Sequence, residues 1–422
     1  MNDAAEIRNY AGAVACGAYE RDHGGLYGKH DNVRRCWEDQ ANRLALREVL
    51  AGVVEERRQE LSRVRILDLG CGAGEGFEIV SGVRQAATEV AAGNPPVLPE
   101  WMLGAYRGVD FSPAMVDKAR ELYAEHAKLR FDVADLRDGL PVSADEEPYD
   151  FYFSSFGSLS HLDDEQLGGL LDGICEHMGR RAVFVADMLG RYSYEWPCYW
   201  DGPPAGGGTM QPYSMSYIHP PELRDQVPIE TMAIRYWGGT ELSEFVAERV
   251  GRHGRRVVSE ERRDRSIVVG RHMDTAEYNP AAQPIRQAVS SLHEANRRTD
   301  LTELLFDFVA QPGHPEVNTF LERYQIAWNT VVLACMETVA SDGAADPEAM
   351  ALTTDRLPAP VSRAIETMVN VVEHVGWFDM GDPLANLIEP QLGHVLRTLE
   401  GDLQQGLGAA HGLLCIFVLA RD

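Results

Sequence analysis

The sequence is poor in lysine, and its cysteines lack the spacing of metal sites. Only three of the 39 basic residues are lysine, namely Lys29, Lys118 and Lys128, a bias typical of a GC-rich genome. The seven cysteines form no CxxC pair. Neither a zinc site nor a disulfide framework is therefore expected, and we predict reduced thiols and no bound metal.

Long apolar runs are also missing. No stretch of about 18 apolar residues occurs, which is the length that a membrane-spanning helix needs. The first residues, Met1 to Glu6, are acidic and lack the charged-then-apolar pattern of a signal peptide. We therefore expect a cytoplasmic protein without a membrane partner.

Positive charge is scarce relative to negative charge. The chain has 65 acidic residues and a net charge of −26, spread along its length. Nucleic-acid binding draws its affinity from the neutralisation of phosphates, so a nucleic-acid substrate is not expected. The arginines between 252 and 265 alternate with acidic residues, and we interpret 256–271 as a terminal hairpin with a solvated edge.

Strand and helix patterns alternate through the first half of the chain. Short apolar segments at 64–69, 106–110, 129–133, 150–154 and 182–186 predict strands, and segments at 75–91, 112–127 and 164–177 predict helices. This alternation is typical of an α/β fold with a Rossmann-like, doubly wound and mostly parallel sheet. An amphipathic pattern over 32–60 predicts a helix, and we interpret residues 1–62 as an N-terminal helical cap or lid.

The second half of the chain has a different character. Tryptophan and tyrosine crowd among proline and glycine at 188–238, which favours an aromatic substrate lid inserted into a domain at 63–275. After Pro280 the apolar period is helical, so we predict an all-helical C-terminal extension, at 276–422. Its closing segment, Leu413–Leu419, is nevertheless strand-like and should add to a sheet, because an unpaired apolar strand would aggregate.

The segment Asp68-Leu69-Gly70-Cys71-Gly72-Ala73-Gly74 carries the clearest chemical signal. A strand ends in three glycines and a helix follows. Glycine lets a backbone approach a ligand closely, and the helix N-terminus offers free N–H groups. This segment resembles the first motif of class I S-adenosylmethionine (SAM)-dependent methyltransferases, in which the glycines contact the amino-acid part of SAM and the acid supports its ammonium region.

Three further segments resemble later motifs of the same family. Gly108-Val109-Asp110-Phe111-Ser112 is similar to the motif whose carboxylate binds both ribose hydroxyls, after an insertion around 93–104. Phe131 to Leu136 resembles the adenine-binding motif, where Asp135 fits better than Asp132. Tyr149 to Leu162 is similar to the fourth motif in the branch that methylates small metabolites. The resemblance implies these cofactor-binding residues: Asp68, Gly70, Cys71, Gly72, Gly74, Asp110, Phe111, Met115, Asp135, Leu136, Ser154 and Ser155.

The base is harder to predict than the cofactor site. His161 is the first candidate, because histidine titrates near neutral pH, with Tyr27, His30 and His219 as further candidates. His161 could equally hold its loop by a hydrogen bond, and Asp135 could be a solvated turn residue. Cys71 is interpreted as small and buried rather than nucleophilic.

The resemblance implies methylation of a small molecule on oxygen or nitrogen, for example a secondary metabolite or an amine, with S-adenosylhomocysteine (SAH) as product. Two alternatives stay open. The enzyme could cyclise or transfer another part of SAM, or the protein could be a non-catalytic SAM-binding partner. The C-terminal helices could form a homo-oligomer interface or complete the substrate pocket.

Overall fold

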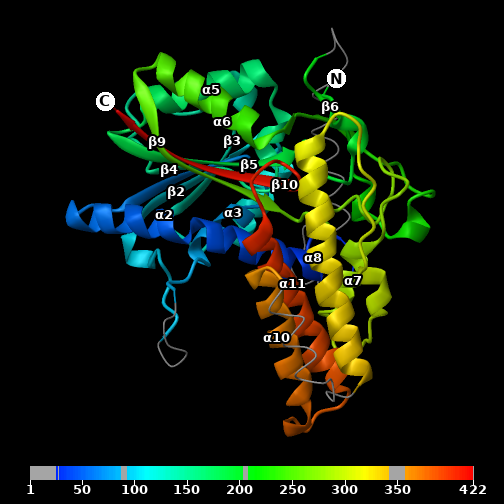
Figure 1. Ribbon diagram of the computed structural model, residues 1–422. Coiled ribbons are helices and arrows are strands. Elements are labelled where there is room, and N and C mark those ends of the chain that lie inside the picture. Colours follow the sequence, from blue (N-terminus) through cyan, green and yellow to red (C-terminus); the bar gives the residue numbers. More distant parts are fainter. Residues whose placement is uncertain (1–24, 27, 87–92, 203–207, 342–356, 422) are drawn as a thin grey trace.

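The computed structural model describes residues 25–26, 28–86, 93–202, 208–341 and 357–421 (Figure 1). A mixed sheet with helices on both faces forms the centre, and a helical bundle extends from one end of it. The predicted fold class is therefore confirmed. Among the described residues, no helix combines the length and the apolar character that crossing a bilayer requires.

The central sheet has the strand order β3-β2-β1-β4-β5-β10-β9, and β8 pairs with β5. Its strands are β1 (Val64–Leu69), β2 (Leu103–Asp110), β3 (Leu129–Val133), β4 (Phe151–Phe153), β5 (Arg181–Gly190), β8 (Tyr236–Trp237), β9 (Arg255–Arg265) and β10 (Gly412–Arg421). The neighbouring strands β3, β2, β1, β4 and β5 are parallel to one another. The strand β10 runs antiparallel to both β5 and β9.

Helices cover both faces of this sheet. In Figure 1, α5 (Asp164–His177) and α6 (Gly239–Arg252) lie above it, while α2 (Asp39–Gln59) and α3 (Glu75–Ser81) lie below it. The helix α4 (Pro113–Leu122) packs into the same core as α2 and α3. The helix after β1 ends at Ser81 and so is shorter than predicted; residues 87–91 of that prediction lie outside the described residues.

The predicted hairpin at 256–271 is wrong. Residues 255–265 form one strand, β9, whose partner is β10 from the far end of the chain. Ser266 has a positive φ of 65°, which ends the strand, and residues 267–269 are then buried against the helical bundle. The alternating charges were interpreted as the solvated edge of two consecutive strands joined by a turn. The strand at 255–265 instead pairs with a segment distant in the sequence.

The described part of the C-terminal region is mainly helical before its last strand. It contains α7 (Ile285–Ser291), α8 (Pro315–Ala340), α10 (Ala359–Glu373) and α11 (Glu389–Leu403), whose apolar faces share one core with Val33 and Trp37 of the N-terminal segment. The closing segment joins the main sheet as β10, as its strand-like pattern predicted. Within the described residues, the description of this region as all-helical fails at its end, where β10 joins the sheet.

The aromatic segment forms a separate small core beside the sheet. A two-stranded sheet of β6 (Gln211–Ser214) and β7 (Thr231–Ile234) packs with the end of β5. The buried side chains of this core are Leu189, Trp196, Tyr213, Met215, Met232, Ile234 and Tyr236. The segment therefore lies next to the carboxyl ends of the parallel strands.

Candidate active site

A cavity lies where β1, β2 and β4 end, and it is open to solvent. Its empty space is about 1430 Å³ when the part open to solvent is included. Ligands of open α/β sheets bind at such carboxyl ends. One side of the cavity is formed by the glycine segment after β1 and by the residues that follow β2 and β3. The other side is formed by the aromatic segment and by residues close to both ends of the chain.

The glycine segment turns sharply before α3. Gly70, Gly72 and Gly74 have φ angles of 76°, 53° and 87°, which disfavour residues with a side chain. A Cβ at Gly70 would lie 2.6 Å from the Cβ of Ser158, so the two loops approach too closely for any other residue. Gly70 and Gly72 line the cavity, whereas Gly74 packs against Tyr123 behind it.

Asp110 ends β2 with its carboxylate at the cavity. One oxygen accepts a hydrogen bond from Gly72 N at 2.9 Å and the other accepts one from Ser112 N at 2.9 Å. Burial raises the pKa of Asp110, and the two backbone donors oppose that rise. Because each carboxylate oxygen can accept more than one hydrogen bond, both keep capacity for a ligand. Phe111 and Met115 line the cavity beside it.

Asp68 lies beneath the glycine segment rather than in the cavity wall. Its side chain is fully buried and accepts a hydrogen bond from the Tyr106 hydroxyl, while its other oxygen has no partner. Burial raises the pKa of Asp68 to about 7. This placement suits support of the segment from behind better than direct contact with a ligand.

The residues after β3 place Asp135 and Leu136 at the cavity. The guanidinium of Arg137 donates hydrogen bonds to both oxygens of Asp135. These hydrogen bonds are the main reason that the pKa of Asp135 lies below its usual range. Asp132 is not among the lining residues and pairs with Arg107 and Arg130 instead. The geometry therefore agrees with the preference for Asp135 over Asp132.

The loop after β4 contributes the centre of the cavity wall. Ser155 lines it, whereas Ser154 is fully buried and does not reach it. Phe156 adopts a positive φ of 55°, and the guanidinium of Arg34 lies 3.2 Å from the centre of its ring. Ser158 donates to the carbonyl oxygen of Gly70 at 2.9 Å and so ties this loop to the glycine segment.

The four candidate bases are placed very differently. His161 lines the cavity, and burial together with the Arg137 charge lowers its pKa to about 4. His219 is not among the lining residues, and His30 pairs with Glu75 at 3.2 Å. Tyr27 lies outside the described residues. Of the three candidates within the described residues, only His161 lies at the cavity wall.

Cys71 also lines the cavity, but its thiol is not activated. Burial raises the pKa of Cys71 well above its ordinary value, and nearby Asp68 and Asp110 add to the rise. A thiol that stays protonated is a poor nucleophile. The structure shows that Cys71 is buried, as expected; that it does not act as a nucleophile stays a prediction.

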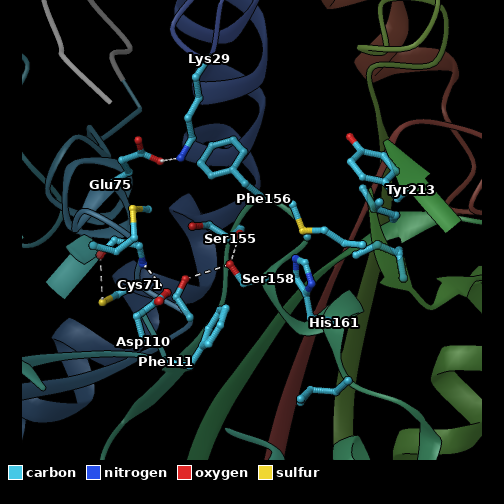
Figure 2. A pocket seen from close by; sticks show the side chains of 18 of the residues that line it. Lys29, Cys71, Glu75, Asp110, Phe111, Ser155, Phe156, Ser158, His161 and Tyr213 are labelled. Atoms are coloured by element: carbon cyan, nitrogen blue, oxygen red, sulfur yellow. Dashed lines mark hydrogen bonds and ion pairs between the residues drawn. The ribbon is translucent and has the colours of Figure 1, made fainter. Parts of the chain in front are cut away.

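Sequence reasoning missed the charged end of the cavity. Glu75, the first residue of α3, pairs with Lys29 at 3.4 Å and with Arg34 at 3.5 Å. Figure 2 shows the Lys29–Glu75 pair at one end, with Phe156 between it and Tyr213. Burial lowers the pKa of Lys29 to about 8, although Glu75 opposes that change. The rarity of lysine in this chain was the available signal.

The aromatic side of the cavity is mostly apolar. Tyr213, Met215, Tyr217, Met232, Ile234 and Leu189 line it, together with Arg265, Arg271 and His411. Arg265 pairs with Asp187 at 2.9 Å, and Arg271 lies 3.4 Å from Glu38. His411 comes from the end of the chain, and no motif of the sequence indicated it.

Comparisons with known proteins point to one domain type. Residues 96–180 match the family model described as a methyltransferase domain. This range covers β2 to α5 and includes Asp110, Asp135 and the loop after β4. No curated protein matches the chain.

Several solved structures are similar to this chain at low sequence identity. The chain is similar to magnesium protoporphyrin IX methyltransferase from Synechocystis PCC 6803 with bound SAH, with 14% identity over 62% of this chain and 93% of that chain and a TM-score of 0.35. A DhpI–SAH complex gives 16% identity over 61% and 89%, with a TM-score of 0.36. A putative methyltransferase complexed with the Haloferax volcanii Trm112 activator gives 17% over 62% and 79%, with a TM-score of 0.33.

Proposed function

We propose, from the class I SAM-dependent methyltransferase domain that this chain carries, that it transfers the methyl group of SAM to a small molecule on oxygen or nitrogen. One observation carries the proposal. A single cavity joins the Asp110 and glycine wall to an apolar, aromatic wall. A cofactor and an acceptor could therefore meet inside it.

The residues at the Asp110 wall fit SAM chemically. Asp110 has two carboxylate oxygens oriented by backbone donors, which suits a pair of ribose hydroxyls. The left-handed glycines at 70 and 72 keep side chains away from the methionine part. Phe111, Met115 and Leu136 offer apolar surface for an adenine ring, and Asp135 lies next to them.

The lining of the cavity offers places for two molecules, because the Asp110 and glycine wall lies on one side and an apolar, aromatic wall on the other. Tyr213, Met215, Met232 and Ile234 would enclose an apolar acceptor and exclude water. Bound SAM supplies an already activated methyl group, so the protein has to hold the acceptor in line with it.

The charge of the protein supports a small acceptor over a nucleic acid. The chain has a net charge of −26, which would repel a polyanion. The cytoplasmic location and the homo-oligomer expected from the sequence remain proposals of the same kind.

Calorimetry with SAH tests the cofactor site. Replacing Asp110 with alanine should weaken SAH binding by about 1–3 kcal/mol, because the ribose hydroxyls would lose a buried acceptor. Asp117→Ala is the matched control, since Asp117 lies on α4 with its side chain 71% exposed. Equal SAH affinity of Asp110→Ala and the wild type would refute the assignment of Asp110.

Product analysis tests the reaction itself. The protein with methyl-labelled SAM and a panel of phenols, alcohols and amines should release SAH and label an acceptor. Release of methylthioadenosine instead would favour transfer of another part of SAM. Total RNA and DNA should stay unlabelled, and strong labelling of either would overturn the small-molecule proposal.

A further inference from the structure

A second histidine lies in the cavity wall, and a buried carboxylate holds it. His411 precedes β10 and is 7% exposed. Its Nδ1 lies 2.8 Å from Oε2 of Glu195, a side chain with no solvent exposure. Unlike Glu195, His411 contributes to the wall of the cavity.

The backbone around His411 is fixed from both sides. Its amide donates to the carbonyl oxygen of Ser266 at 3.1 Å, and its own carbonyl oxygen accepts from Gly190 N at 3.1 Å. These partners lie at the ends of β9 and β5, so the sheet positions the histidine. The ring of Trp196 packs 5.5 Å from the imidazole.

Glu195 is held in place by several donors. The Ser193 hydroxyl donates to Oε2 at 3.1 Å, and the backbone amide of His272 donates to Oε1. Burial opposes ionisation of Glu195, but His411 and His272 outweigh it and keep its pKa below the usual value. Gly270 leaves room for this carboxylate, because a Cβ there would lie 2.0 Å from Oε2.

This arrangement determines the tautomer of His411. An ionised carboxylate only accepts hydrogen bonds, so the Nδ1 that faces Glu195 must carry a proton. Nε2 of the neutral ring then has a free electron pair. A carboxylate that orients an imidazole in this way also stabilises the imidazolium formed when the ring takes up a proton.

We infer that His411 is the general base for methyl transfer and that Glu195 is its positioning residue. The acceptor is a hydroxyl or a protonated amine on a largely apolar small molecule. This inference rests on the proposed function. As the acceptor's electron pair forms the bond to the methyl carbon, the carbon–sulfur bond breaks and its pair stays on sulfur. The proton of the acceptor passes to Nε2 of His411 and later to water.

His161 is less suited to this role. Its pKa of about 4 reflects burial and the Arg137 charge, and both effects disfavour the protonated ring. His411 instead has the Glu195 carboxylate 2.8 Å from its Nδ1, which fixes the orientation of its ring. The apolar part of the acceptor would contact Tyr213, Met215, Met232 and Ile234 on the same side of the cavity.

Histidine NMR tests the pair without any acceptor. In the SAH-bound, ¹⁵N-histidine-labelled protein at mildly alkaline pH, the signals lost in His411→Gln should show a protonated Nδ1 and an unprotonated Nε2. Glu195→Gln should reverse this tautomer, because the amide NH₂ would face Nδ1. A protonated Nε2 in the wild type, or no change in Glu195→Gln, would overturn the pair.

Turnover tests the role of the pair. With the hydroxyl or amine acceptor found in the panel, His411→Gln should lower kcat about 10²–10⁴-fold, the usual contribution of a general base. Glu195→Gln should lower kcat while the KM for SAM stays the same. The matched thiol of the same acceptor, which ionises readily, should be affected much less by either change.

Three controls separate the possible failures. His374→Gln changes an exposed histidine outside the cavity and should turn over like the wild type. Equal losses for the hydroxyl and thiol acceptors, or a larger loss in His161→Gln than in His411→Gln, would refute the inference. A wild-type protein that methylates nothing in the panel counts against the proposed function, and the tautomer measurement then decides whether the pair exists.

Discussion

At the scale of single residues, charges that line the cavity are often paired with other charges of the chain. Glu75 pairs with Lys29 and Arg34, and Arg265 pairs with Asp187. Such pairs leave local dipoles rather than open charges, so the cavity can accept a molecule with both polar and apolar parts. Asp68, which lies behind the cavity wall, differs from these residues, because one of its oxygens is buried without a partner.

Asp68 should make the stability of the protein without SAM depend on pH. Its folded-state pKa of about 7 lies above the ordinary value of 3.8. Between these values the folded state keeps a proton that the unfolded chain has lost, so stability falls as pH rises from about 4 to 7. Asp68→Asn has no such proton, and the Tyr106 hydroxyl can still donate to its amide oxygen.

Urea unfolding at pH 5 and pH 8 measures this effect. The difference in the free energy of unfolding between Asp68→Asn and the wild type should favour the variant by about 2–4 kcal/mol more at pH 8 than at pH 5. The exposed variant Asp117→Asn should show no comparable trend. The same stability difference at both pH values would mean that Asp68 is ionised in the folded protein throughout.

At the scale of elements, β10 carries more of the architecture than its position in the sequence indicates. Leu413, Cys415, Phe417 and Leu419 pack on the face covered by α5 and α6, and Leu414, Ile416 and Val418 pack on the opposite face. Burial on both faces explains the continuous apolar run, which is typical of central strands. The pattern predicted a strand but not which strands it would pair with.

Phe417 is the residue whose loss should test this packing. It has no solvent exposure and stacks on Phe184 with ring centres 6.1 Å apart. Phe417→Ala should lower the free energy of unfolding by about 3–5 kcal/mol, because the strand is held from both sides and the space cannot close. Leu333→Ala, at a position 50% exposed on α8, should change the free energy of unfolding little. A loss below about 1 kcal/mol for Phe417→Ala would contradict a central position of β10.

At the scale of the whole molecule, the C-terminal strand completes the sheet, and residues near both ends of the chain line the cavity. The strand β10 lies between β5 and β9. The bundle core includes Val33 and Trp37 from the N-terminal segment, and Tyr194 and Trp200 from the aromatic segment. Trp37 also donates to Glu400 on α11 at 2.8 Å. The C-terminal region is thus packed against the rest of the protein over several elements.

A chain ended after Asp274 should therefore fail to form a functional protein. It would lose β10, expose the edges of β5 and β9, and uncover the apolar partners of the bundle. We expect aggregation during purification and no measurable SAH binding, checked by gel filtration and calorimetry. A soluble, monomeric product with wild-type affinity for SAH would show that residues 275–422 form an independent module.

The sequence by itself determined the local parts of this protein. The limits of β1 and β3 and those of α5 agree with the residue patterns, because periodicity and glycine positions act over a few neighbours. Asp110 and Asp135 were singled out because their segments resemble methyltransferase motifs; Asp110 ends β2, and Asp135 follows β3 by two residues. The helix after β1 was overestimated, as the apolar pattern alone does not say where packing ends.

Only the tertiary structure decided which distant segments meet. Strand pairing across more than 140 residues places β10 beside β9, and a one-dimensional pattern holds no information about that choice. The same pairing brings His411 to Glu195, although 216 positions separate them, and it replaces the predicted hairpin at 256–271. Asp68 was expected to support the SAM ammonium, directly or through water, yet burial under the glycine segment leaves it facing Tyr106. Distant segments meet because the strands of this sheet bury apolar side chains on both faces. Hydrophobic burial selects partners by shape and surface rather than by their order in the chain.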